Sequence, residues 1–369
     1  MRFCPVILFL AGSLLLAGCS SPLTTGKAYL YQEVFHVTTR NDTGLTRPDK
    51  RFGGERGSTR FGVSMLAVDP DKTFSAFAAA QPNHSLQQEA LLESQPVQQI
   101  VDLEQESFFE QLSAYSSPDN PHPPFLIYIH GYKKSFKRAA VISAQLRYEL
   151  GFPGPVITFS WPSTNAVSGY AADLENLNWS RPVLQQLIVG LQENYPESPI
   201  HIIAHSMGNK ALLETLDDLQ QVALSTGEWS IGEIILVAPD IDQEIFIRDV
   251  ASRLATMPSR KTLYVSSKDF PLFASATVYQ YPRLGDSRNG VTVVEGVETI
   301  DVSDAIPLFE GHGYYEANKE TIEDLYYLIN KGLGAEERPL LEAVETEEGK
   351  YWRLPTAKRG FLTSVIAER

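Results

Sequence analysis

The residues best suited to chemistry lie where a short apolar run ends. Ile200 to Ile203 is rich in β-branched residues and leads into Ala204-His205-Ser206-Met207-Gly208, after which a helical pattern begins at once. Small residues stand two positions to either side of Ser206, as a sharp, strained strand-to-helix turn requires. Such a turn lifts the hydroxyl clear of a sheet, and the helix N-terminus offers partial positive charge to an oxyanion. The pattern predicts a nucleophilic serine; the alternative is a serine that only caps a helix.

A serine nucleophile needs a general base, and the chain has seven histidines. Six of them precede the regular part of the chain or lie inside a strand or a tight motif: His36, His84, His122, His130, His201 and His205. The seventh, His312, stands between two glycines just before the last predicted helix. The chain order serine, aspartate, histidine of hydrolases places the base there. The alternative for His312 is a loop histidine that caps the final helix.

The acid that orients the base has several candidates. Asp269 follows one predicted strand, where its carboxylate could accept the Nδ1 proton of the histidine. Asp240 and Asp242 follow the preceding strand and are its rivals, while Asp301 and Asp304 lie too close to the histidine loop for the usual geometry. Any of them could instead be a turn or N-cap aspartate. We predict Asp269, with Asp240 as the main alternative.

The oxyanion of the reaction needs backbone donors close to the serine. His130-Gly131-Tyr132 ends the first strand of the regular part, where hydrolases supply one such amide. Gly131 lets the backbone turn close to a substrate, so we expect the amides of Tyr132 and Met207 to be the donors. We expect His130 itself to be a structural hydrogen-bonding residue.

Apolar strands and amphipathic helices alternate through the part of the chain that contains these residues. Because near-continuous apolar strands are typical of a parallel sheet covered on both faces, we predict an α/β fold with a mostly parallel central sheet. Ligands of such sheets bind at the carboxyl ends of the strands, where every candidate lies. The predicted strands are Phe125 to Ile129, Val156 to Phe159, Ile200 to Ile203, Ile234 to Val237 and Thr262 to Val265, and the helices centre on 139–150, 183–191, 211–219, 245–254 and 322–329.

The flanking regions are less regular. We predict strands at Glu33 to Thr39 and Arg60 to Val68, a Gly/Arg-rich loop at Arg51 to Gly57, a surface excursion over 71–98, a helix at Val101 to Leu112 and a β-rich run at Val291 to Val302. The α/β domain is therefore expected to span residues 33–332. Residues 333–369 have no clear period and are predicted to be a C-terminal tail that packs back on the domain.

The N-terminus has the proportions of a secretory signal. An apolar run from Val6 to Leu16 leads into Leu16-Ala17-Gly18-Cys19, which resembles a bacterial lipobox. The resemblance implies a signal peptide over 1–18, acylation of Cys19 (for example by palmitate) and a tether over 19–32. Ser20, rather than aspartate, after the cysteine favours sorting to the outer membrane of a Gram-negative cell. We therefore expect a lipid-anchored protein of the bacterial envelope, on the outer membrane and facing the periplasm. An ordinary cleavage site and an uncleaved anchor are the alternatives.

Composition excludes several other classes. A net charge of −14 argues against nucleic acid as a partner, since a phosphate-binding surface would normally show basic bias. The chain has no metalloprotease, paired-cysteine, phosphate-loop or dinucleotide motif, so neither a metal nor a nucleotide cofactor is expected. The two cysteines, Cys4 and Cys19, leave none for a disulfide once the signal is removed.

Taken together, the motifs resemble a bacterial family of α/β hydrolases, esterase- or lipase-like, whose function is not known. The resemblance runs from about Val34 to Asn330 and is carried by these segments: Thr39-Arg40, the Gly/Glu/Arg stretch, His130-Gly131-Tyr132, Ser160-Trp161-Pro162-Ser163, Ala204 to Gly208, Ala238-Pro239-Asp240 and Ser266 to Asp269. It implies an α/β-hydrolase fold with a catalytic triad of Ser206, Asp269 and His312. It implies no particular substrate.

Three functions agree with these patterns. The first is a membrane-tethered serine hydrolase that cleaves a carboxylic ester or thioester, of a small molecule or a lipid, through an acyl-enzyme on Ser206. The second is a non-catalytic binding or scaffold lipoprotein of the envelope on a hydrolase fold, since a fold alone does not determine function. The third is an acyltransferase. Because the sequence offers a candidate for every catalytic role, we favour the hydrolase.

Overall fold

The computed structural model describes residues 29–73, 94–164, 166–226, 229–305, 312–314 and 318–356. The predicted signal peptide, Cys19 and most of the tether lie outside these residues. So do most of the surface excursion expected over 71–98 and the last residues of the predicted tail. Among the described residues, no helix is long and apolar enough to cross a membrane.

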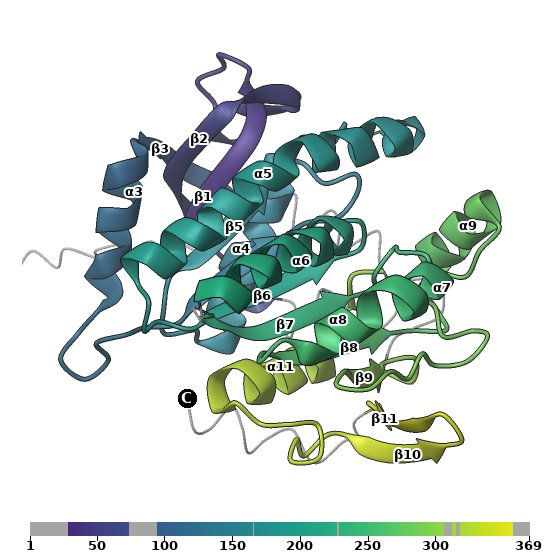
Figure 1. Ribbon diagram of the computed structural model, residues 1–369. Coiled ribbons are helices and arrows are strands. Elements are labelled where there is room, and N and C mark those ends of the chain that lie inside the picture. The colour runs from purple at the N-terminus through teal and green to yellow at the C-terminus, as the bar shows by residue number, and fades with distance from the viewer. Residues whose placement is uncertain are drawn as a thin grey trace, which may run out of the picture.

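One sheet runs through the described part of the chain (Figure 1). Its eleven strands follow the order β10-β11-β9-β8-β7-β6-β4-β5-β1-β2-β3. The strands are β1 (Leu30–Asp42), β2 (Phe52–Val68), β3 (Val97–Leu103), β4 (Phe125–Ile129), β5 (Val156–Ser160), β6 (Ile200–His205), β7 (Ile231–Val237), β8 (Arg260–Val265), β9 (Glu298–Asp301), β10 (Glu342–Thr346) and β11 (Gly349–Arg353).

The centre of the sheet is parallel and its two edges are antiparallel. Every pair from β1 through β5, β4, β6, β7, β8 and β9 to β11 is parallel, whereas β2, β3 and β10 join by antiparallel pairing. The strands β4, β5 and β6 are buried at every position, as expected for parallel strands covered on both faces. The carboxyl ends of these strands therefore meet at one edge.

Helices cover both faces of this sheet, each over its own apolar core (Figure 1). Alternate strand residues point to opposite faces, so Tyr128 and Ile203 pack with α4 and α11, while Ile127 and Ile202 pack with α5 and α6. The helices are α3 (Gln105–Leu112), α4 (Phe136–Leu150), α5 (Tyr170–Asn194), α6 (Gly208–Thr226), α7 (Gln243–Ile245), α8 (Ala251–Thr256), α9 (Phe270–Tyr279) and α11 (Lys319–Lys331), with a π-helical turn at Phe246–Val250 and 3-10 turns at Pro48–Lys50, Pro70–Lys72, Ser113–Tyr115 and Val167–Gly169. The predicted α/β architecture with a mostly parallel sheet is confirmed.

The Gly/Arg-rich stretch expected as a loop is instead part of a strand. β2 begins at Phe52 and pairs with β1 through two register shifts around Arg40. A Cβ on Gly57 would lie 2.6 Å from the carbonyl oxygen of Arg40, so glycine is needed there because two backbones approach closely at a bulge, not because the chain turns.

Three other segments differ from the sequence prediction. Residues expected to begin a helix at Val101 belong to β3, which pairs with β2, and the helix begins only at Gln105. The β-rich run contributes a strand only at Glu298–Asp301. The residues after 332, expected to be a tail, extend the sheet: β10 and β11 form a hairpin, and β11 pairs with β9. Leu354 then packs fully buried in the core, so the sheet continues beyond the expected boundary.

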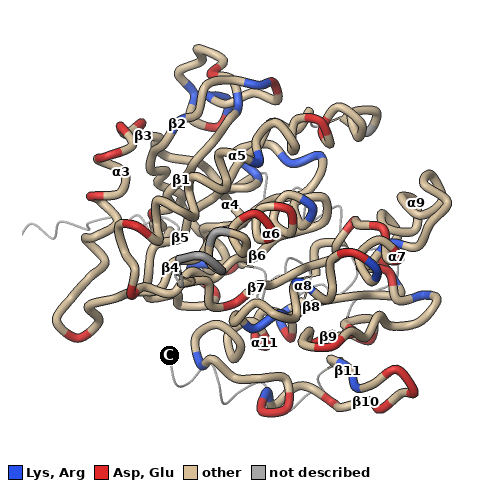
Figure 2. Tube along the Cα trace, viewed as in Figure 1, with Lys and Arg blue, Asp and Glu red and all other residues tan. Residues whose placement is uncertain are grey.

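Charged residues are distributed over the whole length of the sheet. Figure 2 shows Asp and Glu along α3, on α6 and on the β10–β11 hairpin, and Lys and Arg on α6 and on the hairpin as well. The net charge of −14 is therefore not gathered in one patch in this view.

Candidate active site

Ser206 lies on the turn between β6 and α6. Its φ of 53° is left-handed, a strained conformation for a residue that is not glycine. The turn leaves no room around it: a Cβ on Gly208 would lie 2.7 Å from the His130 carbonyl oxygen, and a Cβ on Gly131 would lie 2.7 Å from the Ser206 Cβ. The side chain of Asn209 donates to the Ser206 carbonyl at 2.9 Å and holds the turn from inside the helix.

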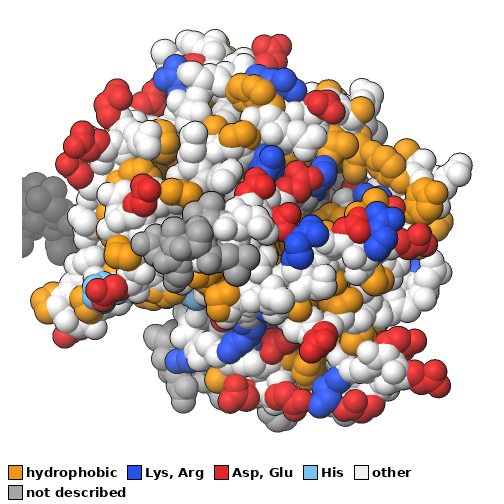
Figure 3. Space-filling view, in the orientation of Figure 1, with side chains coloured by type: hydrophobic (Ala, Val, Ile, Leu, Met, Phe, Trp, Pro, Cys, Tyr) orange, Lys and Arg blue, Asp and Glu red, His pale blue; other side chains and the backbone are white. Residues whose placement is uncertain are grey.

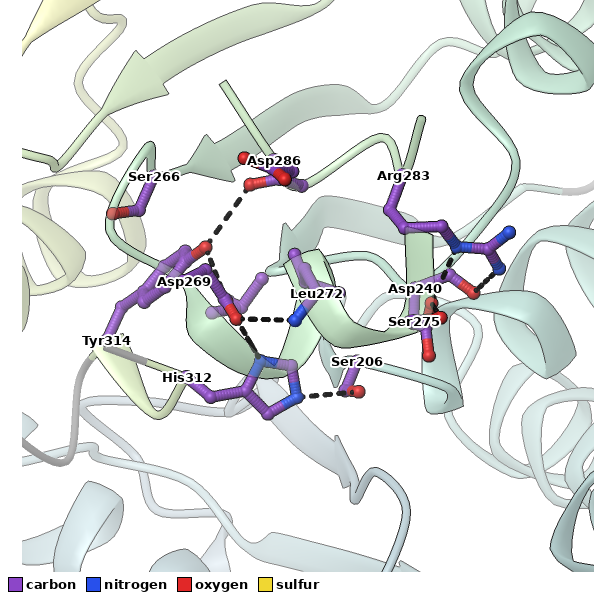
Figure 4. Close-up of polar contacts among 12 residues, drawn as sticks. Ser206, Asp240, Ser266, Asp269, Leu272, Ser275, Arg283, Asp286, His312 and Tyr314 are labelled. Atoms are coloured by element: carbon purple, nitrogen blue, oxygen red, sulfur yellow. Dashed lines mark hydrogen bonds and ion pairs between the residues drawn. The ribbon is translucent and has the colours of Figure 1, made fainter. Parts of the chain in front are cut away.

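His312 links this serine to Asp269. The Ser206 Oγ lies 2.8 Å from His312 Nε2, and His312 Nδ1 lies 2.9 and 3.1 Å from the two carboxylate oxygens of Asp269 (Figure 4). An ionised carboxylate only accepts, so the network assigns the proton of the neutral ring to Nδ1 and leaves Nε2 free to accept from the serine hydroxyl. The ring of His205 holds the loop through its Nε2, 2.6 Å from the His312 carbonyl oxygen.

Asp269 is fully buried at the N-terminus of α9. Its Oδ1 accepts from the Leu272 amide at 2.9 Å as an N-cap, and its Oδ2 accepts from the Tyr314 hydroxyl at 2.9 Å. The side chain of Arg288 donates to the Asp269 carbonyl oxygen. The carboxylate is therefore fixed in position by the Leu272 amide and the Tyr314 hydroxyl.

The surroundings of His312 change how readily its ring takes up a proton. Burial opposes the charged form, but the charge and hydrogen bond of Asp269 outweigh it and raise the pKa of His312 above its ordinary value, with a smaller contribution from Asp240. An imidazole that gains a proton during a reaction would be stabilised in the same way.

Asp240 lies near Ser206 but faces other partners. Its Oδ1 accepts from Arg283 Nε and from the Ser275 hydroxyl, both at 2.7 Å (Figure 4). Its Oδ2 accepts from the Tyr170 hydroxyl at 2.7 Å. Arg283 also donates to the Asp240 carbonyl oxygen at 2.9 Å. The structure thus brings Asp269, not Asp240, to the histidine. Asp242, the other rival on this loop, caps α7 through the Ile245 amide.

The two aspartates near the histidine loop lie elsewhere. Asp301 accepts from the amide of Ser303 at 3.0 Å and also from its hydroxyl. Asp304 pairs with Arg353 at 3.6 Å on the exposed surface. Within the described residues, neither is hydrogen-bonded to His312.

The two residues expected to supply the oxyanion donors belong to the segments that meet at the serine. Met207 lies between Ser206 and the start of α6, and Tyr132 follows Gly131, where a Cβ would lie 2.7 Å from the Ser206 Cβ. Behind this loop, the ring of His130 stacks on that of Trp161 with centroids 4.7 Å apart, and Trp161 Nε1 donates to the His130 carbonyl at 2.8 Å. His130 is therefore a buried hydrogen-bonding residue of the loop.

The aromatic residues after β5 differ in their surroundings. Trp161 is fully buried, Tyr170 contacts the rings of Tyr132 and Tyr279, and Trp179 is 42% exposed beneath the guanidinium of Arg56. Hydrophobic side chains also gather on the surface over α9 and α7 (Figure 3). The exposed large apolar residues of this region are Ile245, Ile247, Phe270, Phe273, Val278, Tyr279 and Tyr281.

Several residues of the site had no role in the sequence prediction. Tyr314 lies two positions after His312 and was given no function, and Arg283, which neutralises Asp240, was not singled out. α9 was missed as well, although an aspartate two residues before Pro271 is a helix-start signal that could have shown it. In the described part of the chain, no group of three or more His, Cys, Asp or Glu side chains is placed to hold a metal ion.

The sheet topology, the strained serine turn and the serine–histidine–aspartate series together define an α/β hydrolase. Residues 104–326 match the family described as alpha/beta hydrolase of unknown function (DUF900), and the chain belongs to that family. The predicted family resemblance is thereby confirmed over residues 104–326, and the predicted part before residue 104 lies outside the match. A further similarity is to an uncharacterized protein of Nostoc sp. (strain PCC 7120), 35% identical over 72 residues. That match covers 20% of this chain and 19% of the Nostoc protein, so the chain spans only about a fifth of the relative.

Proposed function

We propose that this chain is a serine hydrolase that cleaves carboxylic esters or thioesters through an acyl-enzyme on Ser206. The observation that carries the proposal is the hydrogen-bonded series from Ser206 Oγ through His312 to Asp269, with distances of 2.8 and 2.9 Å. Nucleophile, base and orienting acid lie within the reach that proton transfer needs. The left-handed backbone of Ser206 adds support, because strain of this kind is concentrated at functional sites.

The reaction follows from these contacts. His312 Nε2 takes the proton of the Ser206 hydroxyl as Oγ attacks the carbonyl carbon, and Asp269 stabilises the imidazolium. The amides of Tyr132 and Met207 bind the oxyanion of the tetrahedral intermediate. The imidazolium then gives its proton to the leaving oxygen or sulfur. Water, activated by the same histidine, attacks the acyl-enzyme and releases the carboxylic acid.

A fluorophosphonate probe tests this proposal. The full-length protein is expected to be labelled covalently, and Ser206→Ala is expected to lose the label completely while keeping its melting temperature within a few degrees. Turnover of a short p-nitrophenyl ester should fall by about 10⁴-fold or more in the variant. A folded wild-type protein that neither labels nor turns over esters would show that the site is not catalytic.

The second part of the proposal concerns location. Leu16-Ala17-Gly18-Cys19 supports acylation of Cys19, and at ~3.5 Å per residue the nine residues 20–28 reach about 30 Å, which would keep the domain close to its membrane. The substrate would then be a lipid or a small acyl ester of the bacterial envelope. Metabolic labelling with an alkyne analogue of palmitate tests this: wild type should incorporate it and Cys19→Ser should not.

A further inference from the structure

Arg40 is a buried arginine at the end of β1, outside the segment that matches the family. Only 1% of its surface is exposed, and it precedes residue 104, where the family match begins. The sequence singled it out only as part of the family resemblance. Burying a guanidinium is costly unless its donors are satisfied, so its partners show what it stabilises.

Two partners of Arg40 belong to the loop after β4. Its Nη2 lies 3.2 Å from His130 Nε2 and donates to the Lys134 carbonyl oxygen at 2.6 Å, so it holds the loop on both sides of Tyr132. The remaining donors tie this loop to two other segments. Nε donates to the Ser160 hydroxyl at 2.8 Å, and Nη1 donates to the Gly53 carbonyl at 2.9 Å.

The loop has a conformation that needs such support. Lys133 has a φ of 57°, which is costly for a side chain of this kind. The buried carboxylate of Asp173 accepts from the Thr164 amide at 2.7 Å and lies 3.5 Å from the Lys133 amide. Asp173 thus lies at the amide of the strained residue, and Arg40 binds the carbonyl of the next residue, Lys134. Tyr132 immediately precedes Lys133.

The charge of Arg40 is not neutralised at close range. Among the residues that the structure describes, no carboxylate lies within ion-pair distance of its guanidinium. Burial lowers the pKa of Arg40 to about 9, against the opposing effect of Asp173, so the group stays protonated at neutral pH. Burial, followed by the charge of Arg40, keeps the pKa of His130 well below its usual value. The neutral ring then donates from Nδ1 to the Gly131 carbonyl at 2.8 Å and accepts from Arg40 at Nε2.

We propose that Arg40 is the positioning residue of the oxyanion site: it fixes the loop from His130 to Lys134 so that the Tyr132 amide faces the substrate oxygen, and it adds a buried positive charge behind that oxygen. This inference rests on the hydrolase function proposed above. It makes the segment before residue 104 part of the catalytic apparatus, although the family match does not include it.

Two substitutions in the full-length protein separate position from charge. Arg40→Lys keeps a cation but cannot bridge the loop, and Arg40→Gln removes the charge as well. With a short p-nitrophenyl ester, kcat should fall about 10-fold in the first and about 100-fold in the second, because the loss of one oxyanion donor slows turnover by about 10²–10³-fold. KM should change less than about threefold, since the oxyanion forms only in the transition state. Affinity for a trifluoromethyl ketone, whose adduct with Ser206 carries the oxyanion, should fall in parallel with kcat/KM.

Arg338→Lys is the matched control. Arg338 is 2% exposed, close to the 1% of Arg40, and its partners Asp324, Tyr264 and Glu298 lie outside the site. This variant should lower the melting temperature and leave kcat within about twofold of wild type. If folded Arg40→Lys and Arg40→Gln also keep kcat within twofold, or if only KM rises, the inference is overturned. Wild-type protein without probe labelling or turnover would overturn the proposed function, and this inference with it.

Discussion

Two aspartates near Ser206 share a sequence context and differ in what they hold. Asp240 follows β7 and Asp269 follows the neighbouring strand β8, and both are buried at the carboxyl edge of the sheet. The charge of Asp240 is neutralised by Arg283 at 2.7 Å. The charge of Asp269 faces the His312 ring at 2.9 Å instead.

The difference shows that two aspartates at the same edge of the sheet can have different partners: one joins loops, and the other contacts a histidine. Asp240 joins three segments, because Tyr170, Ser275 and Arg283 all donate to it and all belong to different elements or loops. Its negative charge is matched by a permanent cation, which leaves little to stabilise a transient one. The partner of Asp269 is an imidazole that can change charge during a reaction, so its carboxylate can favour the imidazolium.

The largest effect is expected from a substitution that breaks the pair of Asp269 and His312. Asp269→Asn should lower kcat by about 10⁴-fold, because the amide favours the wrong histidine tautomer while the geometry persists. Asparagine is also a good N-cap, so the Leu272 contact and the stability of α9 should change little. In the wild type, kcat/KM should fall at acid pH as His312 becomes protonated, because the base must be neutral. The midpoint of this acid limb should lie above the ordinary pKa of histidine, because the charge and hydrogen bond of Asp269 outweigh the effect of burial on the pKa of His312. The acid limb should move to lower pH in Asp269→Asn.

The measurement is a pH profile of kcat/KM for both proteins, with Ser206→Ala as the baseline. A variant that keeps more than a tenth of the wild-type turnover rate would contradict the assignment of Asp269 as the orienting acid. An unchanged acid limb would show that another group controls the protonation of the base.

The central strands of the fold could be predicted from the sequence. The predicted strand at Phe125 to Ile129 agrees with β4, and the strand predicted at Val156 to Phe159 is one residue shorter than β5. These strands are easy to predict because parallel strands covered on both faces are apolar at nearly every position. The edges were harder to predict: β2 is mostly exposed or half-buried before Val63 and carries Gly57 close to the irregular pairing with β1, and β3 has only one buried position, Val97. The β10–β11 hairpin is exposed or half-buried throughout, so no apolar period marks it.

The site shows the same limit in another form. Ser206, Asp269 and His312 were predicted because each follows a strand in the chain order of hydrolases, and the structure brings them together. The contacts of Arg40 with Ser160 and of Tyr314 with Asp269 join residues 120 and 45 positions apart. No local spacing encodes such contacts. α9 was missed because its apolar side chains are largely exposed, which hides the amphipathic pattern of a buried helix.

The smallest catalytic effect is expected at Asp240. Asp240→Asn leaves the buried guanidinium of Arg283 without its carboxylate, which should cost about 3 kcal/mol of unfolding free energy, while kcat stays within about threefold. The acid limb should move slightly to lower pH, because the charge of Asp240 also raises the pKa of His312. Urea denaturation followed by ester turnover at a temperature where the variant is folded measures both. If turnover by the folded variant fell as steeply as is expected for Asp269→Asn, Asp240 would belong to the catalytic relay, and the two aspartates would share one role. If Asp240→Asn loses stability but keeps its turnover rate, the two aspartates have separate roles: Asp240 holds the loops around the serine, and Asp269 acts on the base.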